Sequence, residues 1–196
     1  MPPAAPHTAP HTMPAPITAT VAPVFPWPQA ADYVFRDEHR APLPPVCGPL
    51  DGSDLLRAFG GSAPAWVDAL MAARNQVVGR LGLKTGPMPA ALQGPLQVGQ
   101  YLGMFQVRHL GPDLALMGED DSHLDFRIFV RVDRTTAPAS EAVELVVSTW
   151  VRPHNWAGRA YLAVVWPFHW LISKVMVRRL AGLLAATAPH PPHTQP

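Results

Sequence analysis

Residues 118–132, GEDDSHLDFRIFVRV, constrain the fold more than any other part of the chain. An acidic turn leads into a segment in which polar and apolar residues alternate, which is typical of a β-strand with two unlike faces. One face carries the ionisable side chains of His123, Asp125 and Arg127. The other face is apolar and carries Leu124, Phe126, Ile128, Val130 and Val132. Because the simplest core uses the apolar face, we expect the ionisable face to point outward.

The segments around this strand predict an antiparallel meander followed by a long helix. The predicted strands are 100–109, 113–117, 123–133 and 142–152, and we expect further strands at 32–36 and in the loop before Gln100. The predicted helices are 51–59, capped by Asp51 or Ser53, then 63–81, then 157–184. The helix over 63–81 should bury one apolar stripe, formed by Trp66, Val67, Leu70, Met71, Val77, Val78 and Leu81.

The terminal helix could serve either the core or a membrane. Residues 160–172 are apolar apart from His169, and Lys174, Arg178 and Arg179 follow. This uncharged run is shorter than the roughly 20 residues that a membrane-spanning helix needs. We therefore expect a buried helix held by a curved sheet, with contact to a bilayer surface through its Trp residues and basic end as the alternative.

Charge and cysteine content restrict the partners and the compartment. The 15 Lys and Arg residues nearly balance the 14 Asp and Glu residues, so the broad basic surface that nucleic-acid binding needs is not expected. Cys47 is the single cysteine, which permits no intramolecular disulfide and is compatible with a reducing cytoplasm. No secretory signal pattern is recognisable near Met1, and we expect a cytoplasmic protein.

The chain should form one domain between two flexible tails. Residues 1–22 and 187–196 are rich in proline and histidine, which favours disorder. The domain is expected over 31–186, a length that can bury a core. Outside the tails, five histidines are available for chemistry: His39, His109, His123, His154 and His169.

Motifs of several enzyme classes are missing from the sequence. It contains no P-loop and no dinucleotide-binding glycine fingerprint, so we expect no cofactor. Its serines lack the nucleophile-elbow context, and Cys47 lies among prolines without a local partner. Asp120, Asp121, His123 and Asp125 offer metal ligands, but acidic turns are usually solvated and we predict no metal.

The ionisable strand supplies the first candidate catalytic pair. His123 and Asp125 are two residues apart and can touch, and an aspartate beside an imidazole raises its basicity, as general-base catalysis requires. The alternative is a solvated sheet face on which Asp125 pairs with Arg127 or with a neighbouring strand.

The junction before the terminal helix supplies the second candidate. Asn155 can cap the helix, and Arg159 follows one turn later with His154 before it, an arrangement suited to holding an anion. In the alternative, Arg159 neutralises Asp120, Asp121 or Asp125 and fastens the helix to the sheet. His154 is also a candidate for acid–base chemistry.

Three blocks of sequence resemble a known family. They are PAWVDALMAARNQVVGRLGLK (64–84), GEDDSHLDFRIFV (118–130) and VRPHNWAGRAYLAVVWPFHWLI (151–172), and they resemble the bacterial family of domain of unknown function 2867. The resemblance covers about 31–184 and implies a helix-grip fold of the START or Bet v 1 type (SRPBCC), in which a curved antiparallel sheet wraps a C-terminal helix around a cavity. It implies no particular activity.

The sequence therefore predicts an α+β helix-grip domain that binds a small, largely hydrophobic molecule between sheet and terminal helix. The expected lining is Tyr101, Phe105, Trp150, Tyr161, Val165, Phe168 and His169, with Arg159 or His154 as polar anchors. One alternative is a cofactor-independent enzyme that uses His123 and Asp125, or His154. Another is a structural or membrane-surface protein. The sequence leaves the ligand and the oligomeric state open.

Overall fold

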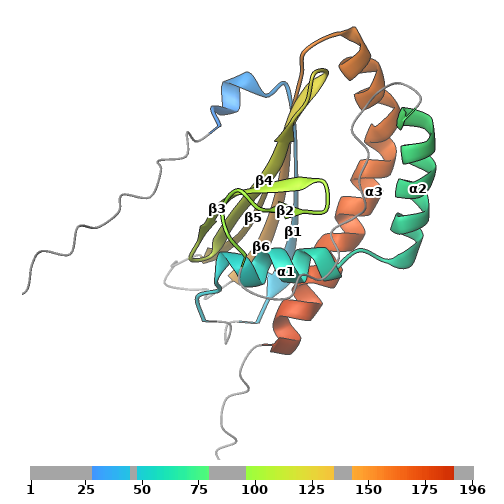
Figure 1. The fold of residues 1–196 in the computed structure, drawn as a ribbon. Coiled ribbons are helices and arrows are strands. Elements are labelled where there is room, and N and C mark those ends of the chain that lie inside the picture. The colour runs from blue at the N-terminus through green and yellow to red at the C-terminus, as the bar shows by residue number, and fades with distance from the viewer. Residues whose placement is uncertain (1–27, 45–47, 80–95, 135–142, 188–196) are drawn as a thin grey trace, which may run out of the picture.

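The computed structural model describes residues 28–44, 48–79, 96–134 and 143–187. Over these ranges it shows one six-stranded sheet with α-helices packed on one side (Figure 1). The elements are η1 (Ala30–Asp32), β1 (Phe35–Leu43), α1 (Gly52–Gly61), α2 (Ala65–Gly79), β2 (Tyr101–Leu102), β3 (Phe105–Gly111), β4 (Leu114–Asp120), β5 (Leu124–Arg134), β6 (Val143–Pro153) and α3 (Trp156–Thr187). The predicted α+β fold, an antiparallel sheet with a long C-terminal helix packed on it, is confirmed.

The strands lie in the order β1-β6-β5-β4-β3-β2, and each neighbouring pair is antiparallel. Strands β2 to β6 form the predicted meander, while β1 pairs with β6 at one edge. The predicted strand over 100–109 is two strands, because Gly103 adopts a φ of 63° in a turn between them. The strand expected at 32–36 begins at Phe35 and continues to Leu43.

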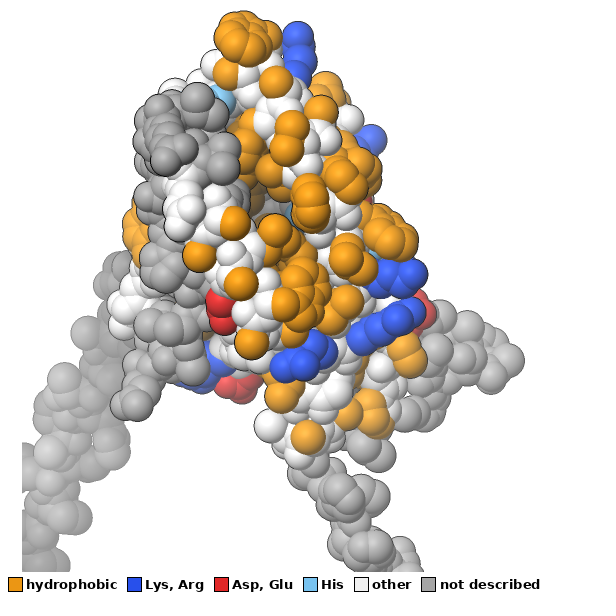
Figure 2. All heavy atoms as spheres, turned by 90° about the vertical axis from the view of Figure 1, so that its right-hand side faces the viewer, with side chains coloured by type: hydrophobic (Ala, Val, Ile, Leu, Met, Phe, Trp, Pro, Cys, Tyr) orange, Lys and Arg blue, Asp and Glu red, His pale blue; other side chains and the backbone are white. Residues whose placement is uncertain are grey.

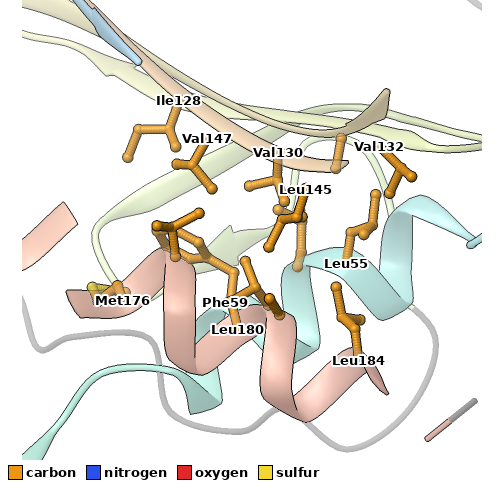
Figure 3. Close-up of a cluster of buried hydrophobic side chains, with 14 of the residues drawn as sticks. Leu55, Phe59, Ile128, Val130, Val132, Leu145, Val147, Met176, Leu180 and Leu184 are labelled. Atoms are coloured by element: carbon orange, nitrogen blue, oxygen red, sulfur yellow. The ribbon is translucent and has the colours of Figure 1, made fainter. Parts of the chain in front are cut away.

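The two faces of the sheet differ as the alternation indicates. The inner face packs on α1 and on the second half of α3 (Figure 3). Its contacts include Ile128, Val130, Val132, Leu145, Val147, Met176, Leu180 and Leu184. Asp125 and Arg127 alternate with these inner residues and lie on the outer face, opposite Arg152 and Trp150 of β6. The predicted outward direction of the ionisable row is therefore confirmed for these two residues.

Helices α1 and α2 begin near their predicted starts. The Asp51 carboxylate accepts a hydrogen bond of 2.7 Å from the Ser53 N–H, so Asp51 caps α1 as predicted. In α2, Val67 is buried but Trp66 is 43% exposed. The expectation that both belong to one buried stripe is wrong, because successive helical residues point about 100° apart. Leu81 of the predicted stripe lies outside the described residues.

Helix α3 is covered less than predicted. Its second half carries the buried residues Met176, Leu180 and Leu184, but in its first half Trp156 is 79% and Val164 69% exposed. The expectation of a buried terminal helix is therefore wrong for the first half. The sheet does not close around the helix, so only one face of that half meets β1 and β6. Among the described helices, α3 is long and apolar enough to cross a membrane by length and composition.

Several predictions fall outside the described residues. The predicted tails over 1–22 and 187–196 do so apart from Thr187, which is the last residue of α3. Cys47 and most of the loop before Gln100 do so as well.

Candidate functional site

An open groove of about 520 Å³ lies between the first half of α3 and the start of β1. It is lined by Val34, Phe35, Pro153, Arg159, Leu162, Ala163 and Trp166. The rings of Phe35 and Trp166 meet edge to face, with their centroids 3.9 Å apart. Arg159 is the one charged residue among these described lining residues. The groove thus combines apolar walls with one cation, the usual character of a small-molecule site.

The start of α3 fixes the position of Arg159. The Asn155 side-chain oxygen accepts a hydrogen bond of 3.0 Å from the Gly158 N–H, which confirms the predicted helix cap. A Cβ atom on Gly158 would collide with the carbonyl oxygen of His123, so the first turn of α3 lies directly against the turn between β4 and β5. Arg159 follows Gly158 in the first turn, where the helix dipole adds positive potential.

A polar cluster lies behind the groove on the inner face of β1. The Asp37 Oδ2 atom is 3.1 Å from His39 Nε2 and 3.5 Å from His169 Nε2. The Ser173 hydroxyl is 3.4 Å from the same His169 nitrogen. Trp166, which lines the groove, stacks on the His169 ring with centroids 5.9 Å apart. One aromatic side chain therefore connects the groove to the cluster.

The Asp37 carboxylate has unused hydrogen-bonding capacity. Its side chain is 9% exposed, and its Oδ1 atom is buried with no hydrogen-bond partner within the described residues. Buried polar atoms are normally paired, so an unpaired carboxylate oxygen suits a site that accepts a hydrogen bond from a bound molecule. The cluster is not a nucleophilic triad, because a triad needs its serine and aspartate on different ring nitrogens and here both lie near His169 Nε2.

Comparison with known proteins supports the resemblance noted in the sequence. The model of the family described as protein of unknown function (DUF2867) matches residues 29–176, which is more than half of the chain. The chain belongs to the DUF2867 family. It matches no curated protein and no solved structure at a significant level. The matched region contains every residue of the groove and of the Asp37 cluster, while the START or Bet v 1 relationship stays a prediction.

Two residues of this DUF2867 domain's polar cluster were given no role by the sequence. His39 was noted only as an available histidine, and Asp37 was missed. Both lie in the run RDEHR, which resembles a solvated charged segment. The usable signal was period-two alternation, since Phe35, Asp37, His39, Ala41 and Leu43 share the inner face with β6 residues such as Thr149 and Val147.

The predicted contact between His123 and Asp125 is wrong. Asp125 pairs instead with Arg152, whose Nε lies 3.1 Å from Oδ2, and with His154, whose Nε2 lies 3.0 Å from the same atom. His123 hydrogen-bonds Ser122 through Nδ1. The register decides this, because Arg152 lies directly opposite Asp125 and a cross-strand neighbour is nearer than a residue two positions along. The hydrogen bond from Arg152 to Asp125 raises the pKa of Arg152.

The predicted partners of Arg127 and Arg159 are also different. Arg127 pairs with Asp120 at 2.6 Å rather than with Asp125, and Arg108 pairs with Asp120 at 2.9 Å. Burial raises the pKa of Asp120, but the two arginines more than offset this and lower it below its ordinary value. With Asp120 and Asp125 taken by other arginines, the expectation that Arg159 neutralises one of these carboxylates is wrong. Arg159 faces the groove instead.

The predicted pocket lining is dispersed over the domain. Trp150 lies on the outer face, where it packs on Phe129 with centroids 4.7 Å apart, so its expected place between sheet and helix is wrong. His154 is on the outer side with Asp125. Tyr101 is exposed on the side of β2 opposite the buried Leu102.

The remaining predicted lining residues divide between the inner and outer sides. Phe105 packs on Phe126 inside the domain, with centroids 5.5 Å apart. Tyr161 and Val165 are half-buried on α3, whereas Phe168 is exposed on the side of α3 away from the sheet. His169 points to the sheet as expected and reaches Asp37. Among the described residues, no group of three or more His, Cys, Asp or Glu side chains could hold a metal ion.

Proposed function

We propose that the domain binds a small, largely apolar acid in the groove between α3 and β1. The observation that carries this proposal is a groove of about 520 Å³ with aromatic and aliphatic walls and a single cationic side chain, Arg159. Its size falls within the range of small-molecule sites. The apolar part of the ligand would lie against Phe35 and Trp166, and its carboxylate would accept hydrogen bonds from the Arg159 guanidinium.

Titration with decanoate and with decanol separates the two halves of this proposal. We expect decanoate to bind more tightly than decanol, and Arg159→Gln to weaken decanoate binding about tenfold while leaving decanol binding unchanged. Trp166→Ala should weaken both. Arg36→Gln, a matched change of an exposed arginine on the outer side of β1, should weaken neither.

Native mass spectrometry of freshly purified protein provides the second test. A reproducible apolar acid carried through purification would support the proposal and identify the ligand class. If no such molecule is carried and neither decanoate nor an apolar fluorescent probe binds, the proposal is wrong. Binding that persists unchanged in both Arg159→Gln and Trp166→Ala would also overturn it, because the ligand would then occupy another site.

A second candidate function is proton transfer on the bound molecule. It is favoured by the buried Asp37 carboxylate, whose Oδ2 faces two imidazoles while its Oδ1 is unpaired among the described residues. His169 beside a carboxylate is a suitable general base for a C–H bond next to a carbonyl group. Bound 3-oxodecanoate in D₂O should then exchange its C2 protons faster with wild-type protein than with His169→Gln. Equal exchange rates in the two proteins would exclude this role.

A further inference from the structure

The first half of α3 presents an exposed apolar stripe on the side away from the sheet. Trp156, Ala160, Val164, Phe168 and Leu171 recur at intervals of three or four residues, so they lie on one face of the helix. All five are exposed, Phe168 by 51% and Leu171 by 48%. The space-filling view of this side shows hydrophobic side chains as its main component (Figure 2). Contiguous apolar surface of this kind marks an interaction site.

The charges around the stripe are basic. Helix α3 carries Arg159, Lys174, Arg178 and Arg179 and contains no Asp or Glu. Lys174 and Arg178 continue the line of the stripe by one and two turns, and the Lys174 ammonium lies over the Trp170 ring at 4.6 Å. Figure 2 shows basic side chains grouped below the hydrophobic area. Apolar and aromatic side chains beside cations are the pattern of a helix that lies on anionic lipid.

We propose that the domain docks on the surface of an anionic lipid bilayer through this face of α3. The stripe would enter the headgroup region, and Lys174 and Arg178 would contact lipid phosphates. Docking rests on the geometry of α3 and requires no ligand in the groove, so it goes beyond the proposed function. The groove opens beside the stripe, since Ala163 lines the groove and Val164 belongs to the stripe.

The same geometry argues against two other occupants. A second copy in a symmetric antiparallel contact would bring the basic end of each α3 against Arg159 of the other, with no acidic residue on either helix to compensate. A spanning helix is disfavoured because the uncharged run between Arg159 and Lys174 is roughly 21 Å long at about 1.5 Å per residue. The second half of α3 is also committed to the core through residues such as Met176 and Leu180.

Vesicle flotation with the full chain tests the proposal. We expect wild-type protein to float with vesicles of phosphatidylcholine and phosphatidylglycerol, about tenfold more weakly with phosphatidylcholine alone, and to be released from both by alkaline carbonate. Val164→Asp combined with Leu171→Asp should reduce flotation at least about tenfold. Val98→Asp, at a residue that is 55% exposed before β2, is the matched control and should float as wild type.

A charge variant keeps the test decisive if the double aspartate variant does not fold. Arg178→Glu should weaken binding to the anionic vesicles only, whereas the control Arg36→Glu should not. Failure of wild-type protein to float, or flotation unchanged in both α3 variants, would overturn the proposal. So would resistance to carbonate, which indicates a spanning helix. A dimer that the α3 variants dissociate, without flotation of the wild type, would identify a second copy as the occupant and overturn it as well.

Discussion

The Nε2 atom of His169 on α3 lies 3.5 Å from Oδ2 of Asp37 on β1, so an ionisable pair joins the terminal helix to the edge strand. His39 Nε2 reaches the same oxygen at 3.1 Å. The cluster is enclosed between sheet and helix, where an apolar set of side chains of similar volume would be at least as stable. A polar cluster in such a place, beside a groove, is better explained by a role in binding than by stability.

We expect Asp37 and His169 to be energetically coupled. In a double-mutant cycle, Asp37→Ala and His169→Ala should each lower the free energy of unfolding, and the double variant should lose less than their sum by about 0.5–1.5 kcal/mol. Urea denaturation measures all four proteins. Asp37→Ala combined with Asp54→Ala, a change on the exposed side of α1, should be additive. A coupling no larger than that of this control pair would show that the two residues do not interact.

The outer cluster should respond to Asp125 far more than to His123. Asp125 is buried and accepts hydrogen bonds from Arg152 and an ion-pair contact from His154, so Asp125→Ala should lower the free energy of unfolding by about 2 kcal/mol. His123→Ala removes only the contact with Ser122 and should cost about 0.5 kcal/mol. Thermal or urea unfolding of the two variants gives the comparison. Equal losses would restore the pairing of His123 with Asp125 that the sequence predicted.

The strands could be predicted because burial of one face leaves a period-two trace. Leu124–Arg134 carries that trace clearly, and the predicted strand over 123–133 differs by one residue at each end. The cover of α3 could not be predicted in the same way. An apolar helix has the same composition whether or not a sheet closes over it, and here the open sheet leaves Val164 and Phe168 exposed.

The candidate site was predicted only in part, for a related reason. Arg159 and His169 were recognised because each lies in or beside an apolar helix, where a polar side chain is conspicuous. Asp37 lies between Arg36 and Glu38, and its burial depends on the pairing of β1 with β6, which brings distant parts of the chain together. A pairing register is a tertiary property, and the sequence of β1 alone does not specify it.

Acid should destabilise the domain through Asp113. Burial raises the pKa of Asp113, but hydrogen bonds from Arg134 and the Leu50 N–H outweigh it, so the pKa lies below its ordinary value. Since the folded-state pKa is the lower one, the stabilisation is present above the unfolded-state value of about 3.9 and is lost as the pH falls through the folded-state value.

The variant Asp113→Asn isolates this effect. Asparagine tolerates the φ of 55° at this position but does not ionise. We expect Asp113→Asn to be less stable than wild type by about 1–2 kcal/mol at pH 7, with most of the difference gone by about pH 3. Urea midpoints at the two pH values measure it. A difference that is the same at both would mean that the Asp113 carboxylate contributes nothing to acid sensitivity.

Gly158 should tolerate no side chain, in contrast to Gly182 on the same helix. A Cβ atom at position 158 would collide with the His123 carbonyl oxygen, which already accepts a hydrogen bond of 2.7 Å from the His154 N–H and therefore cannot move freely. A Cβ atom at position 182 would meet nothing within 4 Å. Gly158→Ala should therefore lower the free energy of unfolding by about 1–3 kcal/mol. Gly182→Ala should raise it by about 0.5–1 kcal/mol, because alanine restricts the unfolded chain and favours the helix. Urea unfolding of the two variants decides the point, and stabilisation by both would mean that the first turn of α3 is free to shift away from the β4–β5 turn.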